Sequence, residues 1–255
     1  MKFKTTPYHY DLIKDTDRLS VFWQAIKEND SNKSLAYDLG CGCGILSYFL
    51  SFYFNEIISL ECNPKISQCA KENLAEFSNI DVINTNVLDY NFEKKADLIV
   101  CEMLDTALID EGQVPILNCA KKFLKEEGKI IPHSVINTVE LVRFKRHNIH
   151  WDDGEYYKSY SNPLVYSQFN FSEDIETNFK TILNIKANKK GIINGLKITT
   201  FTKISKDIIA GPLPMLNPPL MIPLDDKNVN ANDIINVELK YIMGGGIETI
   251  EVNYI

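Results

Sequence analysis

Three glycines at alternate positions, Gly40, Gly42 and Gly44, stand between two apolar segments in the stretch YDLGCGCGILSYFL. Glycine lets the backbone approach a ligand closely, and the start of the following helix attracts an anionic group. An acid, Asp38, comes just before these glycines. The spacing is typical of a loop that holds a nucleotide-like cofactor.

The acid distinguishes between candidate cofactors. A dinucleotide fingerprint has the spacing G-x-G-x-x-G, but Ile45 stands where the third glycine belongs. The Asp38 carboxylate would repel a pyrophosphate and attract the sulfonium and ammonium groups of S-adenosylmethionine (SAM). We therefore expect a SAM site. A nicotinamide or flavin site and a purely structural glycine turn are the alternatives.

Further cofactor contacts are expected where the next two strands end. Glu61 ends the second predicted strand in ISLECNP, and a carboxylate at that position suits a ribose diol. Adenine is expected near Asn86, Val87 and Asp89, directly after the third predicted strand.

Two glutamates in CEMLDTALIDEG, Glu102 and Glu111, are candidates for holding an acceptor. Two facing carboxylates suit a guanidinium, which they bind through paired hydrogen bonds. Transfer of a methyl group from a sulfonium to a guanidinium brings two cations together. Like charges about 4 Å apart cost on the order of 4 kcal/mol at an effective dielectric near 20, and the carboxylates would offset that cost. The alternative is a solvated loop shared with Asp105 and Asp110.

Alternating strand and helix patterns position these residues. Strands are expected over 34–39, 56–60, 80–84, 96–101 and 129–131, and helices over 15–28, 44–54, 64–77 and 114–124. This order predicts a parallel, Rossmann-like sheet covered by helices. After Pro132, β-branched segments without long helices predict an antiparallel barrel or sandwich, and the proline-rich stretch 211–223 predicts a loop. We expect two domains, residues 1–132 and 133–255.

Composition restricts the partners and the location. The chain has 27 Lys and Arg against 34 Asp and Glu, a net charge of −7, which makes nucleic acid binding through bulk charge unlikely and favours a cationic substrate. Six cysteines without a CxxC pair indicate reduced thiols, and no apolar run is long enough for a membrane span, so a cytoplasmic location is expected. The spacing of His147, His150, Asp152 and Asp153 does not favour a metal site.

The quoted motifs resemble those of the protein arginine methyltransferases. Together with KIIPHSV they follow the order and spacing of that family's glycine loop, acid after the second strand, double-Glu loop and step into a β-barrel. The segment HYDLIKDTDRLSVFWQAI is similar to the family's H-x-x-M-L-x-D-x-x-R segment. The resemblance implies a class I SAM-dependent methyltransferase domain followed by a β-barrel, and methylation of an arginine-type nitrogen in a protein substrate.

The resemblance also implies roles for single residues. For the methionine part of SAM, Arg18 would pair with the carboxylate, Leu12 would lie near the sulfonium, and Asp38 and Gly40 would line the rest. Glu61 would bind the ribose, and Val87 and Leu88 would flank adenine. Glu102 and Glu111 would hold the substrate.

Two departures from the family keep alternatives open. The family's Thr-His-Trp loop matches residues 213–224, which contain neither His nor Trp. The second half of the chain is also shorter than usual, so a homodimer would have a reduced dimerisation arm. Other acceptors, namely a protein histidine or another side chain, RNA or a small molecule, remain possible on this evidence, as does a non-catalytic SAM-binding scaffold.

Overall fold

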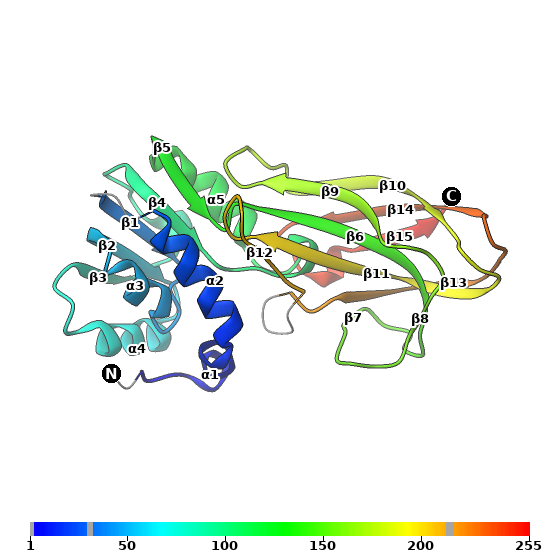
Figure 1. The fold of residues 1–255 in the computed structure, drawn as a ribbon, viewed down its shortest axis with the longest axis horizontal. Coiled ribbons are helices and arrows are strands. Elements are labelled where there is room, and N and C mark those ends of the chain that lie inside the picture. Colours follow the sequence, from blue (N-terminus) through cyan, green and yellow to red (C-terminus); the bar gives the residue numbers. More distant parts are fainter. Residues whose placement is uncertain (1–2, 30–32, 213–216) are drawn as a thin grey trace.

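The computed structural model describes residues 3–29, 33–212 and 217–255. Figure 1 shows an elongated molecule, with helices and a parallel sheet at one end and long antiparallel strands at the other. The N-terminus lies at the helical end and the C-terminus at the other end. Among the described residues, no helix is both long and apolar enough to cross a membrane.

The first sheet contains five parallel strands in the order β3-β2-β1-β4-β5. They are β1 (Lys33–Leu39), β2 (Phe54–Glu61), β3 (Ile80–Asn84), β4 (Ala96–Cys101) and β5 (Leu124–Ile131). The strand order reverses between β1 and β4, and such a reversal opens a crevice at the carboxyl ends of the strands. The predicted Rossmann-like sheet is therefore confirmed.

Helices precede and connect these strands. They are α1 (Pro7–Lys14), α2 (Thr16–Lys27), α3 (Ile45–Leu50), α4 (Pro64–Leu74) and α5 (Gln113–Ala120), with short 3-10 turns η1 (Val87–Asp89), η2 (Thr106–Leu108) and η3 (Lys121–Phe123). The side chain of Asp15 accepts a hydrogen bond from the Arg18 backbone N at 2.9 Å and thereby caps α2. The predicted helix over 15–28 is thus α2, and α1 is a separate helix before it.

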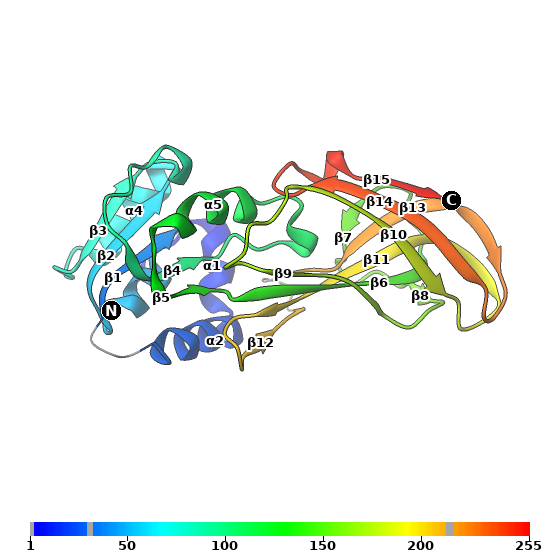
Figure 2. The ribbon, with the colours of Figure 1, turned by 90° about the horizontal axis from the view of Figure 1, so that it is seen from above.

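The second half of the chain forms two antiparallel sheets. One contains β6 (Ser134–Arg143), β7 (His150–Trp151), β8 (Lys158–Ser159), β9 (Leu164–Asn170), β11 (Gly191–Lys203), β12 (Ile209–Ala210) and β13 (Leu220–Val229). The other contains β10 (Asn178–Lys186), β14 (Ile234–Ile242) and β15 (Glu251–Tyr254). The 3-10 turn η4 (Ile247–Thr249) precedes β15. Figure 2 shows β10, β14 and β15 lying over β6 and β11. Buried side chains of both sheets belong to one core, which confirms the predicted antiparallel architecture.

Strand β13 occupies part of a predicted loop. Residues 213–216 of that loop lie outside the described residues, but Leu220 already begins the strand. Pro223 lies opposite Gly195, next to an irregularity in the pairing of β13 with β11. A proline has no N–H to donate and is tolerated at such irregularities, which is why a proline-rich sequence still forms a strand here.

The two kinds of sheet meet at one short connection. The last parallel strand ends at Ile131, the first antiparallel strand begins at Ser134, and Pro132 and His133 join them. The described residues after Ser134 form no α-helix, so they contain no helical dimerisation arm. The assignment of residues 1–132 and 133–255 to separate domains remains a prediction.

Candidate functional site

A cavity of about 270 Å³ lies where β1, β2 and β4 end, bordered by residues of α1 and α2. Seven of the residues selected from the sequence line it: Leu12, Arg18, Gly40, Gly42, Glu61, Glu102 and Glu111. Five of the residues predicted to contact the cofactor thus face the same space as the two glutamates predicted to hold an acceptor.

The glycine loop has the backbone geometry that its sequence suggests. Gly40, Gly42 and Gly44 have φ angles of +74°, +55° and +90°, in the left-handed region that disfavours other residues. A Cβ added at Gly42 would lie 2.7 Å from His9 Nε2, and one added at Gly40 would lie 2.9 Å from Met103 Sδ. Both glycines therefore leave room for the side chains of His9 and Met103, which line the cavity beside the loop.

Gly44 has a different task. A Cβ at this position would lie 2.6 Å from Leu74 Cδ1 of α4. Gly44 also forms the N-cap of α3, and it does not line the cavity. The third glycine therefore allows α3 and α4 to pack closely.

Glu61 ties the glycine loop to the end of β2. Its Oε2 accepts a hydrogen bond from Gly42 N at 3.1 Å, and its Oε1 accepts one from Asn63 N at 2.8 Å. A carboxylate has about four lone-pair positions, so both oxygens can accept further bonds from a diol. The side chain is only 7% exposed, and these bonds hold it in one orientation.

Asp38 does not line the cavity. It is 1% exposed and accepts a hydrogen bond from Ser47 Oγ at 2.5 Å, and the Ser47 hydroxyl also lies 2.8 Å from Ser59 Oγ. Burial raises the pKa of Asp38 to about 6, although the hydrogen bonds from Ser47 lower it. The carboxylate therefore holds α3 against the strands that carry the glycine loop.

The residues expected near adenine lie just after β3 but do not line the cavity. Asn86 Oδ1 accepts a hydrogen bond from Leu88 N at 3.0 Å and thereby caps η1. Val87 is buried in the main core, Leu88 is 50% exposed, and Asp89 ends the 3-10 turn. The structure thus separates this group from the seven residues of the cavity.

Arg18 and Glu102 form an ion pair within the cavity. Their side chains are 3% and 13% exposed, so the pair is largely shielded from water. Arg18 also donates to the carbonyl oxygen of Leu12 at 3.4 Å, which connects α2 to α1.

Glu111 carries a perturbed carboxyl group. Burial raises the pKa of Glu111, Asp110 raises it further, and Arg18 lowers it. The residues after Glu111 also fix Glu102: the buried Gln113 side chain accepts from Met103 N at 2.9 Å and donates to Cys101 O at 2.8 Å. One amide thus binds the backbone on both sides of Glu102.

Some cavity residues are not among those predicted from the sequence. His9 covers Gly42, its Nδ1 lies 2.7 Å from Thr6 Oγ1, and burial lowers the pKa of the imidazole. Its position at the start of the H-x-x-M-L segment could have indicated that His9 lies near the site. Met103 could have been found from its position after Glu102, whereas nothing in the local sequence marks Ile66, in the first turn of α4.

The side chains in this cavity fit SAM. The cavity borders the backbone of Gly40 and Gly42, the guanidinium of Arg18 can bind a carboxylate, and Glu61 can accept from hydroxyl groups. Within residues 3–29, 33–212 and 217–255, no group of three or more His, Cys, Asp or Glu side chains could hold a metal ion.

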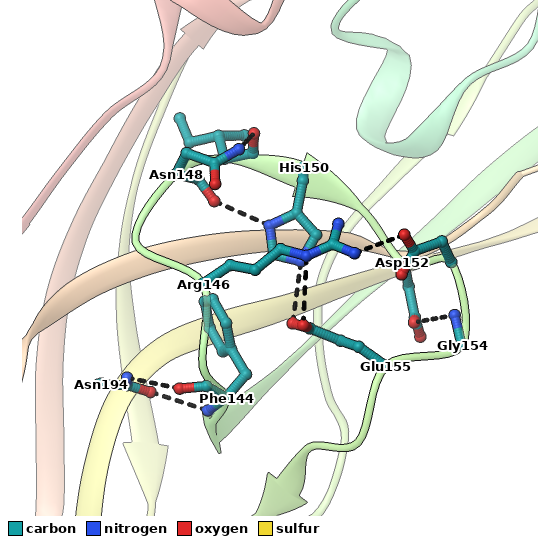
Figure 3. A network of polar contacts seen from close by, with 10 residues as sticks. Phe144, Arg146, Asn148, His150, Asp152, Gly154, Glu155 and Asn194 are labelled. Carbon is teal, nitrogen blue, oxygen red and sulfur yellow. Dashed lines mark hydrogen bonds and ion pairs between the residues drawn. The ribbon is translucent and has the colours of Figure 1, made fainter.

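His150 and the charged side chains around β7 form a network of polar contacts. Figure 3 shows His150 between the carbonyl oxygen of Asn148, 2.8 Å from Nδ1, and Glu155, whose Oε1 lies 3.0 Å from Nε2. Arg146 pairs with Asp153 at 2.5 Å. These contacts hold a surface loop together.

Comparison with known proteins places the chain in a family. A family model described as "Methyltransferase domain" matches residues 36–128. An uncharacterised protein of Methanothermobacter thermautotrophicus is 42% identical over 255 residues, covering all of both chains. Protein arginine N-methyltransferase 7 of Gallus gallus is 30% identical over 155 residues, which are 53% of this chain and 22% of that protein.

A solved structure supports the fold. The chain matches the Trypanosoma brucei PRMT1 enzyme-prozyme heterotetrameric complex with AdoHcy at a TM-score of 0.78, with 16% identity, over 92% of this chain and 87% of that one. The match includes both the parallel and the antiparallel sheets. The chain belongs to the class I SAM-dependent methyltransferases, in a family that includes the archaeal protein and is related to the protein arginine methyltransferases.

Proposed function

We propose that the chain methylates a guanidinium nitrogen of arginine in a cationic protein substrate. The observation that supports this best is that Glu102 and Glu111 line one cavity together with Gly40 and Gly42. The relationship to proteins named as arginine methyltransferases points to the same acceptor. The net charge of −7 also favours a cationic substrate.

Bound SAM supplies the electrophilic methyl group. The two glutamates would bind the guanidinium through paired hydrogen bonds, offset the repulsion between the two cations, and orient one nitrogen for in-line attack. They would also hold positive charge on the nitrogens that they bind, so that the attacking nitrogen keeps its lone pair. Because the pKa of Glu111 is raised, this carboxylate accepts a proton more readily than an exposed glutamate does.

Methyl transfer from tritiated SAM tests the proposal, with a Gly-Arg-Gly repeat peptide and whole-cell extract as acceptors. We expect Glu102→Gln and Glu111→Gln each to lower the transfer rate by about 100-fold or more. The affinity for SAM, measured by calorimetry, should not fall, because both variants keep the size of the side chain.

Asp110→Asn is the matched control. Asp110 lies on the same loop and is exposed, and it does not line the cavity. This variant should methylate at nearly the wild-type rate. Full activity in both glutamine variants would remove the two glutamates from the mechanism. Label found only in RNA or in small molecules would show that the acceptor is not a protein arginine. SAM binding without any methyl transfer would indicate a non-catalytic scaffold.

A further inference from the structure

The loop that connects Glu102 to Glu111 folds around a buried carboxylate. Asp105 is 7% exposed, and its Oδ2 accepts hydrogen bonds from Ile109 N at 2.9 Å and from Asp110 N at 2.8 Å. Its Oδ1 accepts a longer bond, 3.4 Å, from the backbone N of Glu111. The side chain does not line the cavity, so it contacts neither of the predicted ligands directly.

This loop contains backbone strain. Ala107 and Leu108 have φ angles of 61° and 63°, in the left-handed region that residues with a Cβ seldom occupy. Two such residues in succession persist only where surrounding contacts determine the conformation. The sequence of the loop alone does not favour this path between the glutamates.

The antiparallel half of the chain supplies part of the support. Ala107 N donates to Thr200 Oγ1 at 2.8 Å, and the Thr200 hydroxyl donates to Asn137 Oδ1 at 2.6 Å. Gly244 N donates to Leu108 O at 3.0 Å, so the turn after β14 holds the second strained residue. These contacts fix the middle of the loop.

The segment before Glu111 is fixed by Asp105 itself. Three consecutive backbone N–H groups, those of residues 109–111, point to this one carboxylate. An ionised carboxylate can accept all three bonds, whereas protonation turns one oxygen into a donor.

We infer that Asp105 is a positioning residue that holds the backbone of Glu111 so that its side chain faces the cavity opposite Glu102. The inference concerns the shape of the loop, and its catalytic consequence rests on the proposed function of the two glutamates. Asp105 acts through the backbone, so its loss changes how an acceptor is held and leaves the glycine loop intact.

Protonation provides a second signature. Burial raises the pKa of Asp105 to about 7, while the backbone hydrogen bonds from Asp110, Glu111 and Ile109 lower it. The titratable groups that face it are Glu111 and Asp110 on its own loop and Tyr241 of β14, whose pKa Asp105 also raises. The contacts from β11 and from the turn after β14 come from neutral groups. Because the closed loop binds this proton more tightly than an opened loop would, the contribution of Asp105 to loop stability is lost as the pH rises through about 7.

Hydrogen exchange of the full-length protein, measured by mass spectrometry on peptides that cover residues 105–113, tests the inference without an acceptor. We compare Asp105→Asn with Asp110→Asn, which removes the same charge from the adjacent surface. In Asp105→Asn the amide oxygen still accepts from Ile109 N and Asp110 N, but the amide N–H groups face the N–H of Glu111. Exchange in these peptides should be about tenfold faster than in the wild type, and in Asp110→Asn it should be unchanged.

Kinetic measurements with the Gly-Arg-Gly peptide as acceptor test the catalytic consequence of losing Asp105. We expect kcat to fall by about tenfold in Asp105→Asn, with the dissociation constant for SAM within twofold of the wild type. Any change in the wild-type kcat that Asp105 causes as the pH passes through about 7 should be absent from the variant. Unchanged exchange in Asp105→Asn would overturn the inference. A parallel loss of SAM affinity and thermal stability would also overturn it, because the residue would then be merely structural.

The two proposals can fail separately. If the wild type transfers no methyl group to the peptide or to any extract protein, the arginine proposal fails. Faster exchange in Asp105→Asn would still show that Asp105 holds the loop.

Discussion

The guanidinium of Arg18 and the carboxylate of Glu102 form a shielded ion pair, although the family resemblance gives one to the cofactor and the other to the acceptor. If Arg18 binds the SAM carboxylate, as the resemblance implies, it lies between two carboxylates, that of Glu102 and that of the methionine part. Because removing one partner from a buried ion pair leaves an uncompensated charge, binding at Arg18 should depend on the state of Glu102. We therefore expect the pair to couple the two halves of the site.

Replacement of Arg18 tests this coupling. Arg18→Ala should weaken SAM binding by about 10- to 100-fold, because a charge-assisted hydrogen bond contributes about 1.5–3 kcal/mol. Glu102→Gln removes the competing carboxylate and should leave the affinity unchanged or increase it. Calorimetric titration with SAM measures both. Equal affinity in Arg18→Ala and in the wild type would show that Arg18 does not bind the cofactor.

The glycine loop predicts a steric effect. In Gly42→Ala, the new Cβ would overlap with His9 Nε2, and the residue would also keep an unfavourable φ of +55°. We expect SAM binding to be lost in calorimetry while the protein remains folded by circular dichroism. Gly154→Ala is the matched control, because Gly154 has a φ of +91° with no atom within 4 Å of the added Cβ. If both variants bind SAM equally, close approach at Gly42 is not needed.

The buried carboxylate of Asp38 predicts a pH dependence of stability. Its pKa is raised from 3.8 to about 6, so the folded state binds this proton more tightly than the unfolded chain does. The resulting stabilisation is complete below about pH 4 and is lost as the pH rises through about 6. A shift of about two units corresponds to about 3 kcal/mol.

Urea unfolding between about pH 4 and 7 measures this effect. Asp38→Asn should flatten the dependence of the unfolding free energy on pH. Ser47→Ala should make it steeper, because it removes a hydrogen bond that stabilises the ionised form. An equal slope in Asp38→Asn and in the wild type would contradict the assignment of this group.

Local sequence spacing was sufficient for the part of the site that lies at strand ends. Gly40, Gly42 and Glu61 follow predicted strands, and the carboxyl ends of parallel strands meet at one edge, so their proximity follows from topology. Asp38 also lies at a strand end. The sequence could not tell that its side chain accepts from Ser47 instead of reaching the cavity, because this depends on how α3 packs.

Residues that act through backbone contacts were harder to predict. The sequence predicts Asp105 only as part of a solvated loop, and it predicts no role for Gln113. Their partners are main-chain groups of neighbouring residues, so no side-chain pattern marks them. Strand β13 was missed for a related reason, since the proline-rich sequence favours a loop until its pairing with β11 is known.

Gln113 predicts a link between stability and methyl transfer. The side chain is fully buried and binds Met103 N and Cys101 O, the groups on either side of Glu102. Gln113→Met keeps the approximate size but leaves both backbone groups without a side-chain partner. We expect the unfolding free energy to fall by about 1–3 kcal/mol, the cost of unsatisfied buried groups.

Methyl transfer should fall more than stability alone explains, because Glu102 then loses the contacts that orient it. The transfer rate is measured at a temperature where the variant remains folded. Gln113→Glu is a partial rescue, since its carboxylate can still accept from Met103 N but cannot donate to Cys101 O. Gln68→Met on the exposed face of α4 is the surface control and should change neither quantity. If Gln113→Met is destabilised but transfers methyl groups at the wild-type rate, the amide supports the fold without orienting Glu102.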